Sequence, residues 1–152
     1  MRKTIVTLMT AFALAGCCNQ NPLLEPASTP FDTPEFSKIE LAHYKPAVEA
    51  AIAEARADLA AVINNPEAPT FENTVVALER GSSSLDRIAN IFFNLNMTDT
   101  SDEMQQLAQE LQPLLVEFSN DVMLDATLFE RVKTVWESRE QLSLDTEAVV
   151  EL

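Results

Sequence analysis

Only one side chain in the sequence, His43, offers the acid–base and metal-binding chemistry of an imidazole. A catalytic zinc ion takes three protein ligands, usually including two or more histidines, and keeps a further position for water. Neither Tyr44 nor Glu49 completes such a set, and Glu40 with His43, three residues apart, is at best a weak divalent pair. We therefore expect no catalytic, cofactor-binding or metal-binding residue in this chain. His43 is interpreted as a packing or hydrogen-bonding residue at the start of a helix.

The other candidate groups are serines, acids and aromatic residues. Residues 82–84 are consecutive serines, but no histidine is available to activate them, so a catalytic triad is excluded. Twenty-four acidic residues make chance carboxylate pairs inevitable, such as Glu72 with Glu79 or Asp102 with Glu103. Core and inter-helix packing, rather than a ligand cage, is expected for the main aromatic residues: Phe92, Phe93 and Trp136.

One residue near the N-terminus, Cys17, is a candidate for covalent modification. The chain begins with a basic pair, and an uncharged apolar run follows from Thr4 to Ala15. This run is shorter than the roughly 20 residues that cross a membrane, which is typical of a secretory leader. Leu14-Ala15-Gly16-Cys17 resembles a bacterial lipobox, in which the chain is cut before a cysteine that becomes acylated. We expect residues 1–16 to be a lipoprotein signal peptide and Cys17 to be the lipidated first residue of the mature chain.

This interpretation places the protein in the bacterial cell envelope, anchored to a membrane by lipid and facing the periplasm or the exterior. Cys18 has no other cysteine with which to pair once Cys17 is modified, so no structural disulfide is expected. Residues 17–37 are rich in proline and lack helical periodicity, which predicts an extended tether.

The remaining residues, 38–152, follow the three-four spacing of amphipathic helices. We expect helices over about 42–64 and 71–97, the second with a weak point at 81–84. Thr70 is predicted to cap the second helix through its hydroxyl. Ser101 and Asp125 are the predicted caps of the third and fourth helices, Pro113 is expected to kink the third, and Asp145 begins a fifth. No strand-like alternation occurs, so the predicted fold class is all-α, with antiparallel helices.

The composition restricts function further. The formal net charge of −14 disfavours binding to nucleic acid, which requires Lys and Arg against phosphates, and to an anionic lipid surface. The sequence contains only two glycines and no glycine-rich phosphate loop.

Three stretches resemble the start of the thimet-oligopeptidase family of zinc metallopeptidases, in particular its bacterial branch of peptidyl-dipeptidase and oligopeptidase A. They read FDTPEFSKIELAHYKPAVEAAIAEA, NNPEAPTFENTVVALERG and DATLFERVKTVW, and the second, residues 64–81, is the most specific. The resemblance extends from about Asn21 to Leu152. It implies a mostly helical protein of two lobes around a channel that admits short peptides. The zinc-binding H-E-x-x-H helix of the family would lie downstream, and no position here matches it.

Two interpretations of function follow. In the first, the chain is the N-terminal helical segment of a zinc-dependent peptidase that hydrolyses short peptides. It would contribute lobe structure and channel wall, pack against the rest of its own polypeptide, bind no zinc itself and be inactive alone. In the alternative, it is a self-contained acidic helical-bundle lipoprotein that acts as a binding or interaction module. An in-frame continuation after codon 152 that encodes H-E-x-x-H would distinguish the first from the second.

Overall fold

The computed structural model describes residues 21–25 and 29–142, and within these ranges all regular structure is helical. The four α-helices are α1 (Leu41–Ile63), α2 (Ala77–Thr98), α3 (Asp102–Met123) and α4 (Ala126–Glu137). Short helical turns are η1 (Pro30–Asp32), η2 (Phe36–Lys38), η3 (Phe71–Val76) and η4 (Arg139–Gln141). The predicted all-α fold class is therefore confirmed. The signal peptide, Cys17 and the helix expected from Asp145 lie outside the described residues.

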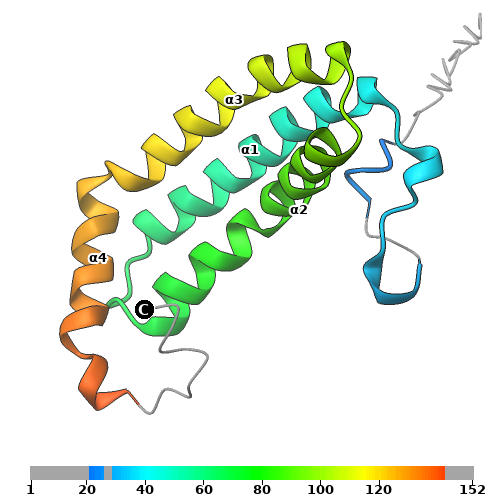
Figure 1. The fold of residues 1–152 in the computed structure, drawn as a ribbon. Helices are drawn as coiled ribbons and strands as arrows, with labels where there is room; N and C mark the ends of the chain where they lie inside the picture. The colour runs from blue at the N-terminus through cyan, green and yellow to red at the C-terminus, as the bar shows by residue number, and fades with distance from the viewer. Residues whose placement is uncertain (1–20, 26–28, 143–152) are drawn as a thin grey trace, which may run out of the picture.

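Helix α1 forms the centre of the fold. It lies between α2 and α3, and the successive helices α1, α2 and α3 run in alternating directions (Figure 1). One side of α1 is buried, and Ala47, Val48 and Ala51 on that side are at most 1% exposed. Small residues at two of these positions allow the neighbouring helices to approach closely. The main core is then completed by larger side chains of α2 and α3, including Leu85, Ile88, Phe92, Leu111 and Phe118.

The second helix begins where the sequence predicts, but its irregular part is elsewhere. Residues Phe71–Val76 form the π-helical turn η3, and the helix continues directly into α2. Residues 81–84, where a weak point is expected, lie within α2, and the helix is not broken there. The irregular winding occurs instead in the first turns, where the chain leaves the Pro66–Pro69 loop.

Both of the later helices start at their predicted caps. The Ser101 hydroxyl accepts a hydrogen bond from the backbone N–H of Met104 at 3.2 Å, and the Asp125 carboxylate accepts one from Leu128 at 2.7 Å. Helix α3 continues through Pro113 to Met123. Helix α4 then turns away from α3 and passes the C-terminal end of α1 to reach η3 (Figure 1).

One described residue of the predicted tether, Leu23, belongs to the core. Leu23 is 1% exposed and packs in the main core, so the expectation of a purely extended segment is wrong at this residue. The Arg87 guanidinium donates to the Leu23 carbonyl at 2.7 Å, and the Asn21 amide donates to the His43 carbonyl at 2.7 Å. These bonds fix the segment against α2 and the start of α1. None of the helices in the described ranges is long and apolar enough to cross a membrane.

Candidate functional site

The residue block 64–81 begins with a tightly bonded turn. Asn64 ends α1, and its side-chain amide donates to the Ala60 carbonyl at 2.7 Å. The Asn65 side chain accepts from the backbone N–H of Glu67 at 2.9 Å, which closes the turn around Pro66. The asparagines therefore satisfy backbone groups at the point where proline prevents α1 from continuing.

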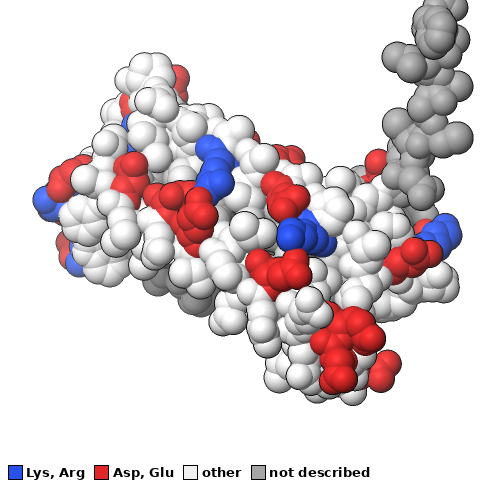
Figure 2. Space-filling view, turned by 90° about the horizontal axis from the view of Figure 1, so that it is seen from above, with Lys and Arg blue, Asp and Glu red and all other residues white. Residues whose placement is uncertain are grey.

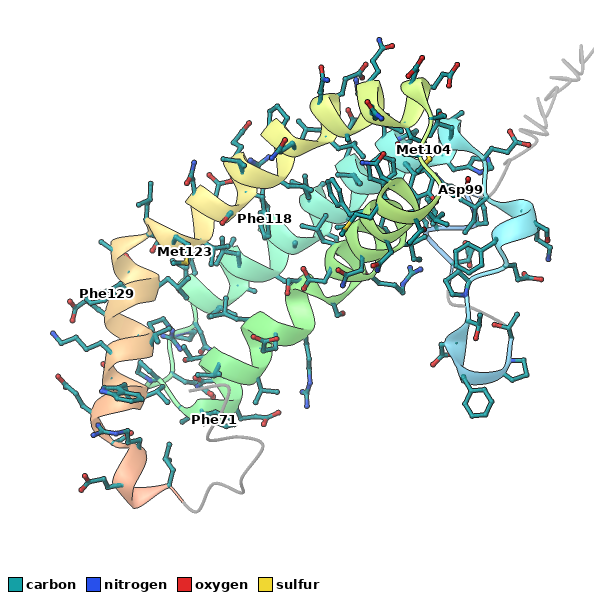
Figure 3. The ribbon with its side chains drawn as sticks, in the orientation of Figure 1. Phe71, Asp99, Met104, Phe118, Met123 and Phe129 are labelled. Carbon is teal, nitrogen blue, oxygen red and sulfur yellow. The ribbon has the colours of Figure 1, made fainter. Side chains whose placement is uncertain are left out.

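The helix after this turn starts at a reciprocal cap, just before Phe71, a residue that Figure 3 labels at the beginning of the helix. The Thr70 hydroxyl accepts from the backbone N–H of Asn73 at 3.1 Å, which confirms the predicted cap. The Asn73 side-chain oxygen accepts in return from the Thr70 N–H at 2.8 Å, and its amide donates to the Ala68 carbonyl at 3.0 Å. Asn73 thus ties both ends of the Ala68–Thr70 segment to the first turn of η3.

Arg131 of α4 holds the same turn from the opposite side. Its residue surface is 8% exposed, and its guanidinium donates to the carbonyl of Asn65 at 3.0 Å and to that of Glu67 at 3.4 Å. A third contact, at 3.4 Å, reaches the Asn73 side-chain oxygen. The Nε atom is buried without a partner in the described part of the chain. Backbone carbonyls and an amide, rather than a carboxylate, therefore receive the hydrogen bonds of this buried cation.

Arg131 is not among the residues expected from the sequence, although the sequence contains a signal for it. In α4 the buried residues are Leu128, Arg131 and Val135, which are spaced by three and four positions. A charged residue at the helical spacing of an apolar stripe indicates a side chain that is buried with partners. Its partners come from the loop more than fifty residues earlier, so their identity depends on the tertiary fold.

A hollow of about 390 Å³ opens beside the block. Its polar lining consists of Asp58, Asn65, Asn73 and Arg80. Both asparagine side chains are engaged in the turn, and Arg80 pairs with Glu72 at 3.1 Å. No nucleophile with an adjacent base is present among these groups, so the hollow has no arrangement for covalent or acid–base catalysis.

His43 has the helix-start role that the sequence indicates. Its Nδ1 atom accepts a hydrogen bond from the backbone N–H of Glu40 at 3.0 Å, so this ring nitrogen is not free to bind a metal. The backbone N–H of His43 donates to the Glu40 carbonyl at 2.9 Å. The interpretation of His43 as a hydrogen-bonding residue is confirmed.

The other candidate groups also have local partners. Ser82 donates to the Asp86 carboxylate at 2.8 Å, and Ser83 donates to the Arg80 carbonyl at 2.8 Å. Hydrogen bonds from its own backbone N–H and from Ser101 lower the pKa of the Glu103 carboxyl group. Within residues 21–25 and 29–142, no three or more His, Cys, Asp or Glu side chains are grouped so that they could hold a metal ion.

The aromatic residues divide into buried and exposed sets. Phe92 is fully buried, with its ring centroid 5.0 Å from Tyr44 and 5.1 Å from Phe93 in edge-to-face contacts, so its predicted core role is confirmed. The core role expected for Trp136 is wrong. Its surface is 47% exposed and its ring lies 4.2 Å from the Arg139 guanidinium. Phe129, also on α4, is 62% exposed (Figure 3).

Charged side chains connect α1 to α3 across the surface. Arg56 contacts Asp121 at 2.7 Å and Glu117 at 2.9 Å, while Lys45 contacts Glu110 at 2.8 Å. Hydrogen bonds to Asp121 and then Glu117 raise the pKa of Arg56, and the bond to Glu110 raises that of Lys45. Figure 2 shows basic groups directly beside acidic groups on this face, with wide uncharged areas between them. These exposed pairs orient α3 on α1 and form no catalytic group.

Comparison with known proteins identifies peptidases. The chain is 38% identical over 129 residues to the dipeptidyl carboxypeptidase of Salmonella typhimurium and 39% identical over 129 residues to that of Escherichia coli. It is 31% identical over 126 residues to the oligopeptidase A of Escherichia coli. The first two matches cover 85% of this chain and the third covers 83%. No family model matches the chain.

These matches confirm the predicted resemblance to thimet-oligopeptidase-family peptidases. They also show how limited its extent is, because the chain spans about a fifth of the length of these relatives. The chain is therefore homologous to a segment of a peptidase.

Proposed function

We propose that this chain is the N-terminal helical segment of a longer zinc-dependent peptidase of the dipeptidyl carboxypeptidase kind. The observation that carries the proposal is the 38–39% identity over 85% of the chain to two dipeptidyl carboxypeptidases. The identity to oligopeptidase A is lower, at 31%. The proposed whole protein releases dipeptides from the carboxyl ends of short peptides.

In this proposal the segment supplies structure and the chemistry lies elsewhere in the polypeptide. The described residues do not fit a zinc site, because the single histidine uses its Nδ1 atom to accept the Glu40 N–H and no set of three ligands converges. Zinc and the general base that activates its water therefore belong to the remainder of the protein. The helices α1 to α4 form part of one lobe beside the peptide channel.

The test is the gene product that continues past codon 152. The expected continuation encodes an H-E-x-x-H helix, and the purified longer protein should release dipeptides from a peptide with a blocked amino end. A chelator should abolish this activity, and the 152-residue chain should lack it. A stop codon at position 153, or a longer product without chelator-sensitive peptidase activity, would refute the proposal.

We also propose that Cys17 is acylated and anchors the protein in the bacterial cell envelope. The support is Leu14-Ala15-Gly16-Cys17 behind a basic start and a short apolar run. Cys17→Ala should leave the protein unlabelled by a fatty-acid tracer and release it from the membrane fraction, whereas Cys18→Ala should not. Equal labelling of wild type and Cys17→Ala would refute the assignment.

A further inference from the structure

An apolar groove runs between α2 and α3. Helix α2 packs mainly on α1, and α2 and α3 approach each other over a shorter stretch. Two hollows of about 220 and 340 Å³ lie along this boundary and share Phe118 and Val122 as lining residues. The two hollows therefore adjoin at Phe118 and Val122, and together they are called the groove, which passes the C-terminal half of α3 that carries Phe118 and Met123 (Figure 3).

Most lining residues of the groove are apolar. Ala55, Leu59, Leu85 and Phe118 are buried at its floor, whereas others are incompletely covered. Leu78, Leu115 and Val122 are half-buried, and Met123 is 76% exposed. Leu124, the next residue after Met123, is also 78% exposed, in the turn before α4. Exposed apolar surface in a groove is typical of an interaction site.

The charged residues of the groove all have the same sign. Glu79 and Asp86 are its charged lining residues, and no Lys or Arg lines either hollow. Asp86 accepts a hydrogen bond from Ser82 at 2.8 Å, and neither carboxylate has an ion-pair partner among the side chains that the structure describes. A complementary occupant thus combines an apolar stripe with Lys or Arg beside it.

The length of the groove matches a short helix. From Leu78 to Ala89, both lining residues on α2, the helix rises about 17 Å at 1.5 Å per residue, or three turns. An amphipathic helix of three turns or more can place side chains at i, i+3, i+4 and i+7 along such a groove. A second copy of this chain is a poor occupant, because each copy carries a formal charge of −14.

The rest of the polypeptide is a source of such a helix that would always be present at the groove. The dipeptidyl carboxypeptidases matched here carry about four fifths of their length outside the matched segment. We propose that the groove between α2 and α3 holds an amphipathic helix from beyond residue 152 of the same polypeptide, with basic side chains facing Glu79 and Asp86. This inference rests on the proposed function, since it requires the longer protein.

A cysteine probe in the groove tests the proposal. Ser119 is exposed and lines the groove, whereas Ser83 is exposed on α2 and lies outside its lining. Ser119→Cys and Ser83→Cys are each made in a background with Cys17→Ser and Cys18→Ser, in the 152-residue chain and in the longer gene product. The rate of reaction with a maleimide is then measured for each form.

Both probes should react at similar rates in the 152-residue chain. In the longer protein Ser119→Cys should react at least about tenfold more slowly, because the covering helix must open first, and Ser83→Cys should be unchanged. Adding Asp86→Lys should restore fast reaction at Ser119→Cys, while the exposed control Glu54→Lys should not. No effect of Asp86→Lys would overturn the assignment of basic partners.

The other outcomes separate this inference from the proposed function. Equal reaction of Ser119→Cys in both forms, with chelator-sensitive peptidase activity intact in the longer protein, would overturn the docking site alone. Slow reaction in the 152-residue chain would also overturn it. If that slow reaction depends on protein concentration, the cover is a second copy, and otherwise it is part of residues 1–152. A longer protein without peptidase activity would refute the proposed function, whatever the rates at which the cysteine probes react with maleimide.

Discussion

Replacement of Arg131 by methionine tests the main tertiary connection of the 64–81 block. The change keeps a long apolar stem and removes every donor, so the carbonyls of Asn65 and Glu67 and the Asn73 side chain lose their shared partner. Because the Arg131 side chain is buried, water cannot easily replace the guanidinium as the hydrogen-bond donor to these three groups. We expect the turn to loosen and α4 to pack less firmly against it.

The size of the effect follows from the geometry of the bonds. A hydrogen bond from a charged donor contributes about 1.5–3 kcal/mol, and the bond to Asn65 has a favourable length of 3.0 Å. The two contacts at 3.4 Å are longer and contribute less. Removing the guanidinium also removes the cost of burying it, which offsets part of the loss. The expected decrease in the free energy of unfolding for Arg131→Met is therefore about 2 kcal/mol.

Urea denaturation followed by far-UV circular dichroism measures this loss, and amide exchange at Thr70 and Asn73 reports on the turn itself. Arg131→Lys should lower the free energy of unfolding by about half as much. The lysine ammonium group can donate to one carbonyl but cannot reproduce the several N–H donors of the planar guanidinium. Lys133→Met, an exposed neighbour in α4, is the matched control and should change stability little. If Arg131→Met unfolds at the same urea concentration as Lys133→Met, and amide exchange at Thr70 and Asn73 is unchanged, the hydrogen bonds of Arg131 do not stabilise the fold.

Substitutions at three further positions test local features. Gly81→Ala should lower the free energy of unfolding by about 1 kcal/mol despite the better helix propensity of alanine, because the new Cβ would stand 2.9 Å from the Cβ of Asp58. The loss should disappear in an Asp58→Gly background, and a gain in the wild-type background would contradict this reasoning. Tyr44→Phe should leave stability unchanged or raise it by up to about 1 kcal/mol in thermal or urea unfolding, because it removes a buried hydroxyl without a described partner. A clear loss would show that this hydroxyl is satisfied. Thr70→Ala should cost about 1 kcal/mol through the lost bond from Asn73, and Thr70→Asp should be close to neutral in the same assay. Equal urea midpoints for wild type and both Thr70 variants would mean that this cap does not stabilise the helix.

The features that sequence predicts well are those encoded within one turn of helix. Thr70, Ser101 and Asp125 each accept a hydrogen bond from the backbone N–H three residues later. Their role depends on neighbours in sequence, so the residue type and the start of an apolar stripe are sufficient to locate them. The role of His43 at the start of α1 is of the same kind, because its partner is Glu40.

The features that sequence did not predict depend on contacts between distant segments. Gly81 suggested a weak point in the helix, but its Cα faces Asp58 of α1, so the missing side chain permits close helix packing. Leu23 lies in a proline-rich segment and is nevertheless buried in the main core. Trp136 is on the surface because α4 buries Leu128, Arg131 and Val135 instead. Apolar residues at three-four spacing identify the apolar side of a helix, but they do not specify which element of the fold covers that side.

The block 64–81, which the sequence predicts to be the most specific part of the resemblance, has structural roles in the described chain. Its polar side chains are used inside the chain: Asn65 closes the turn, Thr70 and Asn73 form the reciprocal cap, and the turn carbonyls receive Arg131. Each role requires a particular donor or acceptor at a particular position, which a generic amphipathic helix would not reproduce. Through Arg131, the block connects the end of α1 and the start of η3 to the middle of α4. In the proposed longer peptidase this connection would hold α4, and with it the polypeptide that follows, against the other helices.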